Sequence, residues 1–345
     1  MNFWSFLKMI DVDLRLSVRP YDHLTPLFLG NVPTPGVKLH LNQATDLMET
    51  RTRLLQGAPE GFDAAEVSFN RYAAGKANGD TSLVGIPAFI LRNFRHRCWY
   101  VRHDSPLESL KDLKGKRVGT DSWNDTGTMW SRAAMRDAGV QISDVKWTLG
   151  KLAPHVSQKP ATPETDSEPA GGAERLPEGE YLLEALEAGR IDAITTAATP
   201  EGIYQQGGKV RRLLRNYRAV EAEYKRRNGF RPGLHIIAVR RDFAEQHPDS
   251  VLTLYKALRD TWPIWWAKLK RFGDATPWAA EEVETMIRDF ADEMPPYGME
   301  SPAHQKMVAS MCKEQFEQQL VPKLCQLEDL FGAFDALHRS AKAAA

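Results

Sequence analysis

The sequence lacks the patterns that identify several common classes of protein. Its 345 residues contain only three cysteines, Cys98, Cys312 and Cys325, and no C-x-x-C pair. An odd, widely spaced set of cysteines is typical of a reducing compartment and argues against a disulfide framework or a structural zinc site. The nine histidines are scattered, without H-x-x-x-H or H-E-x-x-H spacing, so we expect no bound metal.

Signals for nucleotides and nucleic acids are missing as well. Neither G-x-G-x-x-G nor G-x-x-x-x-G-K-[ST] occurs, and we expect the protein to work without a cofactor. The 45 Lys and Arg residues balance 45 Asp and Glu residues, whereas nucleic-acid binding needs a basic footprint. A basic run from Arg211 to Arg227 is broken by Glu221 and Glu223, which indicates a solvated edge.

Long hydrophobic runs are also absent. No window reaches the roughly 18 uninterrupted apolar residues of a membrane span, so we expect no membrane association. The N-terminal stretch MNFWSFLKMIDVDLRL is interrupted by Lys8 and Asp11 and has neither the charged region nor the cleavage site of an export signal. We therefore expect a cytoplasmic protein, with one large or two medium α/β domains for a chain of this length.

The most informative stretch that is present is Leu110–Met135. The pattern predicts a short strand through Gly119, a polar loop over Asp121–Gly127 and an amphipathic helix from Thr128. A strand that enters a helix through such a loop directs free backbone N–H groups and the positive helix end at one spot. This arrangement favours a carboxylate or phosphate, so the loop is a candidate anion-binding pocket.

Strand and helix patterns alternate along the chain and predict mostly parallel sheets covered by helices. The expected strands are 12–18, 37–41, 63–67, 83–86, 98–101, 116–119, 144–149, 191–195 and 235–239, and the expected helices are 46–55, 72–77, 128–138 and 181–188.

The order of these elements predicts two lobes. Residues 1–104 and 233–345 would form the first, discontinuous lobe, and residues 105–232 the second. Residues 154–180, rich in Pro, Glu, Ser, Thr and Gly, would form a flexible insertion. Ligands of such folds bind at the carboxyl ends of strands, here in the cleft between the lobes.

Several long segments resemble the 4,5-dihydroxyphthalate decarboxylase family. They are FRHRCWYVRHDSPLESLKDLKGKRVGTDSWNDTGTMWSR, AAEVSFNRYAAGKANGD, VGIPAFILRNFRH, YRAVEAEYKRRNGFRPGLHIIAVRRD and MPPYGMES. The resemblance implies the two-lobed α/β fold of type II periplasmic-binding proteins, with a mixed or parallel sheet in each lobe. It also implies conversion of 4,5-dihydroxyphthalate to protocatechuate and carbon dioxide in aromatic catabolism. The chain departs from the family pattern at Ser122 and Trp123, where a carboxylate and a tyrosine are usual, and Ile194–Pro200 lacks the usual arginine.

Decarboxylation of a hydroxylated aromatic acid needs a cradle for the carboxylate, a flat slot, a partner for the phenol and an acid for the ring carbon. His96 and His235 are candidate proton donors because histidine titrates near neutrality, and Glu66 is a candidate partner for the phenol. The substrate-binding candidates are Arg19, Asp22, Ser68, Arg95, Trp123, Asn124, Thr126, Thr128, Thr196 and Tyr297.

Structural roles compete with these assignments. Arg19 and Asp22 would form a surface salt bridge, Thr126 or Thr128 would cap a helix, and Tyr297 would sit in a rigid turn. The cluster Trp262, Trp265 and Trp266 is expected in the core or between the lobes.

Three functions fit the sequence to different degrees. The first is a cofactor-independent decarboxylase of a hydroxylated aromatic dicarboxylic acid. The second is a non-catalytic solute-binding protein that closes over a small anionic carboxylate. The third, an enzyme of precursor synthesis on the same scaffold, would need histidine and cysteine clusters that are absent here. The expected partner is a small aromatic carboxylate, and a homo-oligomer stays open.

Overall fold

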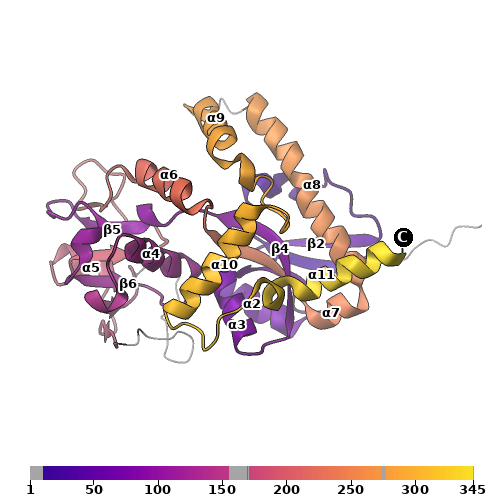
Figure 1. Ribbon diagram of the computed structural model, residues 1–345, viewed down its shortest axis with the longest axis horizontal. Helices are drawn as coiled ribbons and strands as arrows, with labels where there is room; N and C mark the ends of the chain where they lie inside the picture. The colour runs from indigo at the N-terminus through magenta and orange to yellow at the C-terminus, as the bar shows by residue number, and fades with distance from the viewer. Residues whose placement is uncertain (1–10, 155–168, 170, 273–276, 345) are drawn as a thin grey trace, which may run out of the picture.

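The computed structural model has two lobes, each built on one mixed β-sheet (Figure 1). It describes residues 11–154, 169, 171–272 and 277–344. The two lobes lie side by side along the long axis of the molecule. The first lobe is on the right of Figure 1, next to the C-terminal helix α11 (Leu327–Ala344).

The first lobe holds a five-stranded sheet of order β2-β1-β3-β11-β4. β1, β2 and β3 run parallel, and β11 is antiparallel to both β3 and β4. The carboxyl ends of β1 and β3 therefore meet the beginning of β11 at one edge of the sheet. The strands are β1 (Val12–Val18), β2 (Val37–Gln43), β3 (Ala64–Ser68), β4 (Leu83–Arg92) and β11 (Gly233–Arg240).

The second lobe holds a six-stranded sheet of order β10-β5-β9-β6-β7-β8. The four strands β9, β6, β7 and β8 are parallel, whereas β5 is antiparallel to its neighbours. The strands are β5 (Trp99–Arg102), β6 (Arg117–Thr120), β7 (Lys146–Leu149), β8 (Glu174–Arg175), β9 (Ala193–Thr195) and β10 (Val210–Arg212).

Helices cover the faces of both sheets. The helices are α1 (Thr25–Phe28), α2 (Leu47–Gln56), α3 (Phe69–Ala77), α4 (Thr126–Asp137), α5 (Leu182–Glu187), α6 (Tyr217–Asn228), α7 (Arg241–Gln246), α8 (Pro248–Phe272), α9 (Ala279–Phe290), α10 (Pro302–Glu317) and α11 (Leu327–Ala344). Single 3-10 turns lie at Asp22–Leu24, His96–Cys98, Leu110–Leu113, Ile142–Asp144 and Ala291–Glu293.

The chain crosses between the lobes twice. The first crossing runs from the end of β4 at Arg92 to β5, which pairs with β9 and β10 in the second sheet. It therefore precedes the boundary expected at residue 104, because the predicted strand at 98–101 joins the second lobe. The second crossing follows α6, where Gly229 takes the left-handed conformation (φ 76°) that ends the helix.

The segment predicted to be a flexible insertion contains one short strand, β8, near its C-terminal end. Residues 155–168 and 170 of that segment lie outside the described residues. β8, however, pairs in parallel with β7, which places Glu174 opposite Thr148. The C-terminal end of the segment therefore joins the second sheet, while its flexibility stays a prediction.

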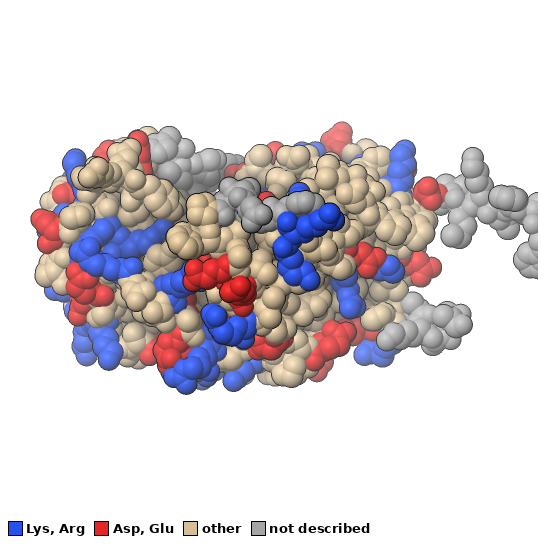
Figure 2. All heavy atoms as spheres, turned by 90° about the horizontal axis from the view of Figure 1, so that it is seen from above, with Lys and Arg blue, Asp and Glu red and all other residues tan. Residues whose placement is uncertain are grey.

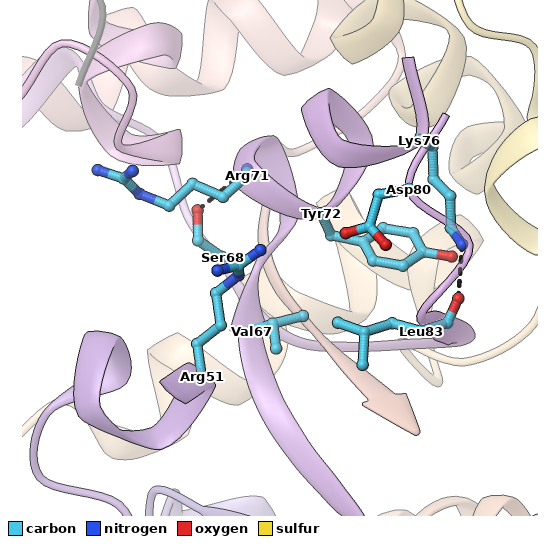
Figure 3. Close-up of a pocket in the computed structure, with 8 residues that line it drawn as sticks. All are labelled: Arg51, Val67, Ser68, Arg71, Tyr72, Lys76, Asp80 and Leu83. Carbon is cyan, nitrogen blue, oxygen red and sulfur yellow. Dashed lines mark hydrogen bonds between the residues drawn. The ribbon is translucent and has the colours of Figure 1, made fainter. Parts of the chain in front are cut away.

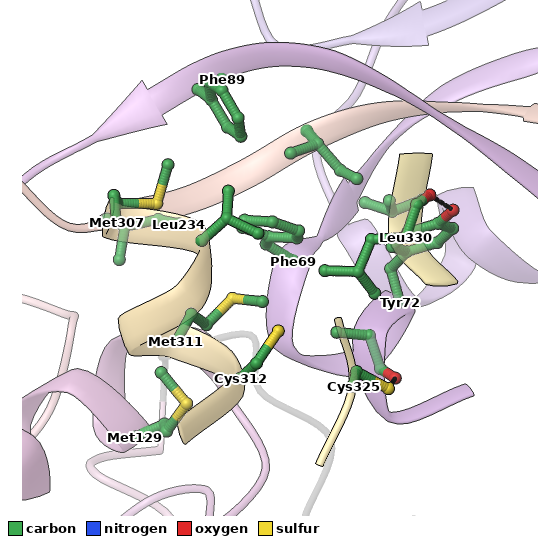
Figure 4. Close-up of a cluster of buried hydrophobic side chains, with 14 of the residues drawn as sticks. Phe69, Tyr72, Phe89, Met129, Leu234, Met307, Met311, Cys312, Cys325 and Leu330 are labelled. Carbon is green, nitrogen blue, oxygen red and sulfur yellow. Dashed lines mark hydrogen bonds between the residues drawn. The ribbon is translucent and has the colours of Figure 1, made fainter. Parts of the chain in front are cut away.

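One apolar cluster joins the two lobes (Figure 4). α10 packs against both α3 and α4, so Met307 and Met311 lie in the same buried cluster as Phe69 of the first lobe and Met129 of the second. Flexible methionine side chains fill the irregular space between elements of different orientation. The cluster holds the lobes in contact on this side.

The surface gives no sign of a single charged face in the view from above, where basic and acidic side chains are interspersed (Figure 2). Within the described residues, no helix is long and apolar enough to cross a membrane.

Candidate functional site

Four polar side chains converge where β1 and β3 end and β11 begins. Glu66 is fully buried. Its carboxylate accepts the Arg19 backbone N–H at 2.9 Å and the Tyr21 hydroxyl at 2.7 Å. Nδ1 of His235 lies 2.5 Å from Glu66 Oε1, and the Arg19 guanidinium lies 3.8 Å from the same atom. We call Arg19, Tyr21, Glu66 and His235 the Glu66 cluster.

The protonation of this cluster follows from its hydrogen bonds. Burial raises the pKa of Glu66, but the hydrogen bond and charge of His235, together with the donors from Arg19 and Tyr21, hold it below its ordinary value. Because an ionised carboxylate only accepts, the proton between the two residues belongs to Nδ1 of His235. The other nitrogen, Nε2, makes no hydrogen bond to a described residue. A histidine oriented through Nδ1 with Nε2 free has the arrangement of a general acid or base.

The role expected for Glu66 changes in this geometry. Both carboxylate oxygens are engaged by protein donors, Oε1 by Tyr21 and His235 and Oε2 by Arg19. The main role of Glu66 in this arrangement is therefore to orient His235 and Tyr21. Burial and the Glu66 charge also raise the pKa of Tyr21, which keeps the phenol neutral as a donor.

The first turns of α3 and α4 face each other across the lobes. Ser68 caps α3, and its Oγ lies 2.8 Å from Oγ1 of Thr126. The backbone N–H of Asn70 donates to the same Thr126 oxygen at 3.0 Å, and its side-chain amide donates to the Asn124 carbonyl at 2.9 Å. Three predicted binding residues, Ser68, Asn124 and Thr126, thus meet at the boundary between the lobes.

The start of α4 is not the open anion cradle that the sequence suggested. The Asp125 carboxylate caps the helix and accepts the Gly127 N–H at 3.1 and 3.2 Å. Thr128 donates its hydroxyl to the Asp125 carbonyl at 3.0 Å, so neither Thr126 nor Thr128 is the cap. A negative side chain already occupies the helix end. Positive charge near this helix end comes instead from Arg95. Its Nε packs so closely against Gly127 that a Cβ atom added to this glycine would lie only 2.9 Å from it.

Thr196 lies at the matching edge of the second sheet. Its hydroxyl donates to Asp121 Oδ2 at 2.6 Å and accepts the Ala198 N–H at 3.1 Å. β9 and β6 are parallel neighbours, so these two side chains follow the carboxyl ends of adjacent strands. The pair orders the loop that carries Asn124 toward the first lobe.

Four other predicted residues lie elsewhere. The His96 ring packs against Tyr224, with ring centroids 5.0 Å apart, and burial lowers its pKa to about 4. The Trp123 ring is buried between Trp147 and the Arg132 guanidinium in the core of the second lobe. Its predicted role as a stacking surface for the ligand is not compatible with this packing.

Tyr297 and Asp22 also lie outside the candidate site. Tyr297 is buried in the core of the first lobe, beside the cis peptide bond Met294–Pro295, and the rigid-turn alternative describes it better. Asp22 is exposed, and Arg19 pairs with Glu66 rather than with it. The surface salt bridge considered for Arg19 and Asp22 is absent among the described residues.

Sequence reasoning missed Tyr21 and Asn70. Tyr21 lies two residues after Arg19, in the turn after β1, and Asn70 lies two residues after Ser68, in the first turn of α3. Their position past a strand end was a usable signal, but tyrosine and asparagine are common in turns and caps.

A small basic pocket lies beside Ser68, between α2, β3 and α3 (Figure 3). Arg51, Arg71 and Lys76 line it with only one acidic side chain, Asp80. Lys76 donates to the Leu83 carbonyl at 2.5 Å, and burial together with Arg241 lowers its pKa. Among the described residues, no group of three His, Cys, Asp or Glu side chains is arranged to hold a metal ion.

Comparisons of the sequence with known proteins point to one family. The model of a family described as NMT1/THI5 like matches residues 36–158. A 4,5-dihydroxyphthalate decarboxylase from Comamonas testosteroni is 28% identical over 306 residues, which cover 86% of this chain and 89% of that protein. A 4,5-dihydroxyphthalate decarboxylase from Pseudomonas putida is 30% identical over 225 residues, which cover 63% of this chain and 83% of that protein. The chain belongs to the 4,5-dihydroxyphthalate decarboxylase family.

Solved structures of low sequence identity share the two-lobed fold of this chain. The periplasmic aliphatic sulphonate binding protein SsuA from Escherichia coli has a TM-score of 0.53 at 15% identity, over 93% of this chain and 99% of that chain. A mutant of the desulfurization enzyme DSZB in complex with biphenyl-2-sulfinic acid has a TM-score of 0.54 at 16% identity, over 97% of this chain and 100% of that chain. The expected family and the expected two-lobed α/β fold are confirmed.

Proposed function

We propose that the protein is a decarboxylase of a hydroxylated aromatic dicarboxylic acid, with 4,5-dihydroxyphthalate as the first compound to test. Relatives that carry the name of this reaction match most of the chain. The single observation that supports a catalytic role is the Glu66–His235 pair at the ends of β3 and β11, in which Nε2 of His235 has no hydrogen-bond partner among the described residues.

The reaction needs only binding and one proton. The ring carbon that carries the carboxylate first takes a proton. The bond between this carbon and the carboxylate then breaks, its electron pair returns to the ring, and carbon dioxide leaves, so no oxidant or reductant is required. A ring hydroxyl para to the leaving carboxylate feeds electron density toward that carbon and favours protonation there.

Residues of the Glu66 cluster can take these roles. The Arg19 side chain is 35% exposed and can hold a substrate carboxylate with its remaining N–H groups. His235 would deliver the proton from Nε2, oriented by Glu66 through Nδ1. Ser68 and Thr126, bonded across the lobes, would help to exclude water when the ligand is enclosed.

The direct test is turnover by the purified protein. We expect 4,5-dihydroxyphthalate to release carbon dioxide and 3,4-dihydroxybenzoate. H235Q should lower kcat by about 10²- to 10⁴-fold, the usual contribution of a positioned general acid. H40Q is the matched control, because His40, on the outer strand β2, is half exposed and pairs with Asp13 of β1. Absence of carbon dioxide from the wild-type protein, with this compound and with hydroxybenzoates, would overturn the proposal.

A second candidate is a non-catalytic binding protein for an anionic aromatic solute. The likeness of the fold to a sulphonate-binding protein favours it. It predicts that phthalates raise the unfolding temperature by mass action while no product forms. Thermal unfolding measured beside the turnover assay separates the two candidates.

A further inference from the structure

An aromatic wall lies directly beside the Glu66 cluster. The ring of His23, in the turn after β1, stacks on the Tyr21 ring with centroids 5.8 Å apart and an interplanar angle of 13°. Trp262 and Trp265 of α8 lie 6.2 and 6.1 Å from the same His23 ring. We call Tyr21, His23, Trp262 and Trp265 the aromatic wall. Both tryptophans are partly buried, and Trp262 packs against the core of the first lobe, one of the two places expected for this cluster.

One polar atom of this wall is buried and unsatisfied. Nε2 of His23 has no hydrogen-bond partner in the part of the chain that the structure describes. Most buried polar groups are paired, and an unpaired one costs about 1–3 kcal/mol. A ligand group that hydrogen-bonds this nitrogen would therefore satisfy an atom for which the described residues supply no partner.

The electrostatics of His23 favour a neutral ligand group. Burial and the charge of Arg231 lower its pKa to about 4, against the opposing effect of Glu66. The ring is therefore uncharged near neutral pH, and Nε2 donates or accepts according to the tautomer. A phenolic hydroxyl can both donate and accept, so it can pair with either tautomer.

The position of the wall links it to the reacting groups. Tyr21 contributes its ring to the wall and its hydroxyl to Glu66, which in turn binds His235. Tyr21 therefore connects the wall directly to the residues that would hold and protonate the ligand. Flat aromatic side chains favour an aromatic ring in offset or edge contacts.

We propose that the aromatic wall is the subsite for the hydroxylated edge of the substrate ring, and that His23 Nε2 hydrogen-bonds a ring hydroxyl. This inference rests on the proposed function and assigns to His23 the recognition of the ring hydroxyl groups. His23 thereby takes the phenol contact that the sequence had assigned to Glu66, whose carboxylate already binds Arg19, Tyr21 and His235.

The test compares two ligands that differ only in the hydroxyls. Calorimetry on the wild-type protein should give an affinity for 4,5-dihydroxyphthalate that is about tenfold or more above that for phthalate. H23F keeps a stacking ring but lacks the nitrogen, so it should lose that preference while phthalate affinity changes by less than about threefold. H23Q, which restores a polar atom near the Nε2 position, should recover part of the preference.

H247F is the matched control. His247 also packs on an aromatic ring, that of Phe243, but it lies at the end of α7. It should leave both affinities unchanged.

The outcomes separate this inference from the proposed function. Equal wild-type affinities for the two ligands would overturn the inference without any variant. So would an H23F protein that is folded and keeps the preference, or one that loses both affinities equally. Preference lost in H23F and regained in H23Q, but without carbon dioxide from the wild-type protein, would support the subsite and overturn the decarboxylase.

Discussion

At the scale of single residues, the buried charge of Glu66 should make folding depend on pH. Its folded pKa lies below the ordinary value of 4.5, so its contribution is complete above pH 4.5 and is lost as the pH falls through the folded pKa. E66Q should lower the free energy of unfolding by about 2 kcal/mol at pH 7, since it weakens hydrogen bonds to a charged group. Urea unfolding at pH 7 and at pH 3.5 should show this difference shrinking at acid pH. A difference that grows instead would contradict the assignment.

The residues that sequence reasoning found share one property. Arg19, Glu66, Ser68 and His235 lie at the ends of strands, and the sheet order brings those ends to one edge. The predicted ligand contact of Trp123 was wrong, because the direction of a loop side chain depends on its packing against other residues, here Arg132 and Trp147. A single sequence does not contain those contacts.

At the scale of elements, the facing ends of α3 and α4 form a link that can be broken with one substitution. T126V keeps the shape but removes the oxygen that accepts the Asn70 N–H and bonds Ser68. It should lower the free energy of unfolding by about 1–3 kcal/mol, because it leaves a buried donor unpaired. Ligand affinity should fall as well, since the bond ties the two lobes.

T52V provides the comparison for that measurement. Thr52 is exposed on α2, and its hydroxyl bonds only the Met48 carbonyl of its own helix among the contacts described. Urea unfolding of both variants checks the prediction, and an equal effect of T52V and T126V would show that the contact between the helices has no special weight.

Most elements could be predicted from periodicity, and the failures have simple causes. β1 spans Val12–Val18 as expected, because its apolar and polar residues alternate clearly. β8 and β10 have two and three residues, too few for a recognisable pattern. α4 begins at Thr126 rather than at Thr128 because Asp125 supplies the cap.

At the scale of the whole molecule, the two lobes could be predicted from the sequence. The buried carboxylate that links the two segments crossing between the lobes could not. Glu293, fully buried, lies 3.0 Å from Arg92 at the end of β4 and 3.0 Å from Lys225 on α6. It also accepts the Arg231 N–H at 2.6 Å, just before β11. The basic run that includes Lys225 looked like a solvated edge in the sequence, because its acidic partner lies 68 residues later.

Removing the charge of Glu293 should therefore destabilise both crossings at once. E293Q leaves the cations of Arg92, Lys225 and Arg231 with less compensation, and breaking a buried ion pair on one side costs about 3–5 kcal/mol. E284Q, on the exposed face of α9, should change the free energy of unfolding by less than about 0.5 kcal/mol. Urea unfolding measures both variants. If E293Q matched E284Q, the buried cluster would not be what stabilises the two lobes, whereas a large loss would make Glu293 the residue on which their relative position depends.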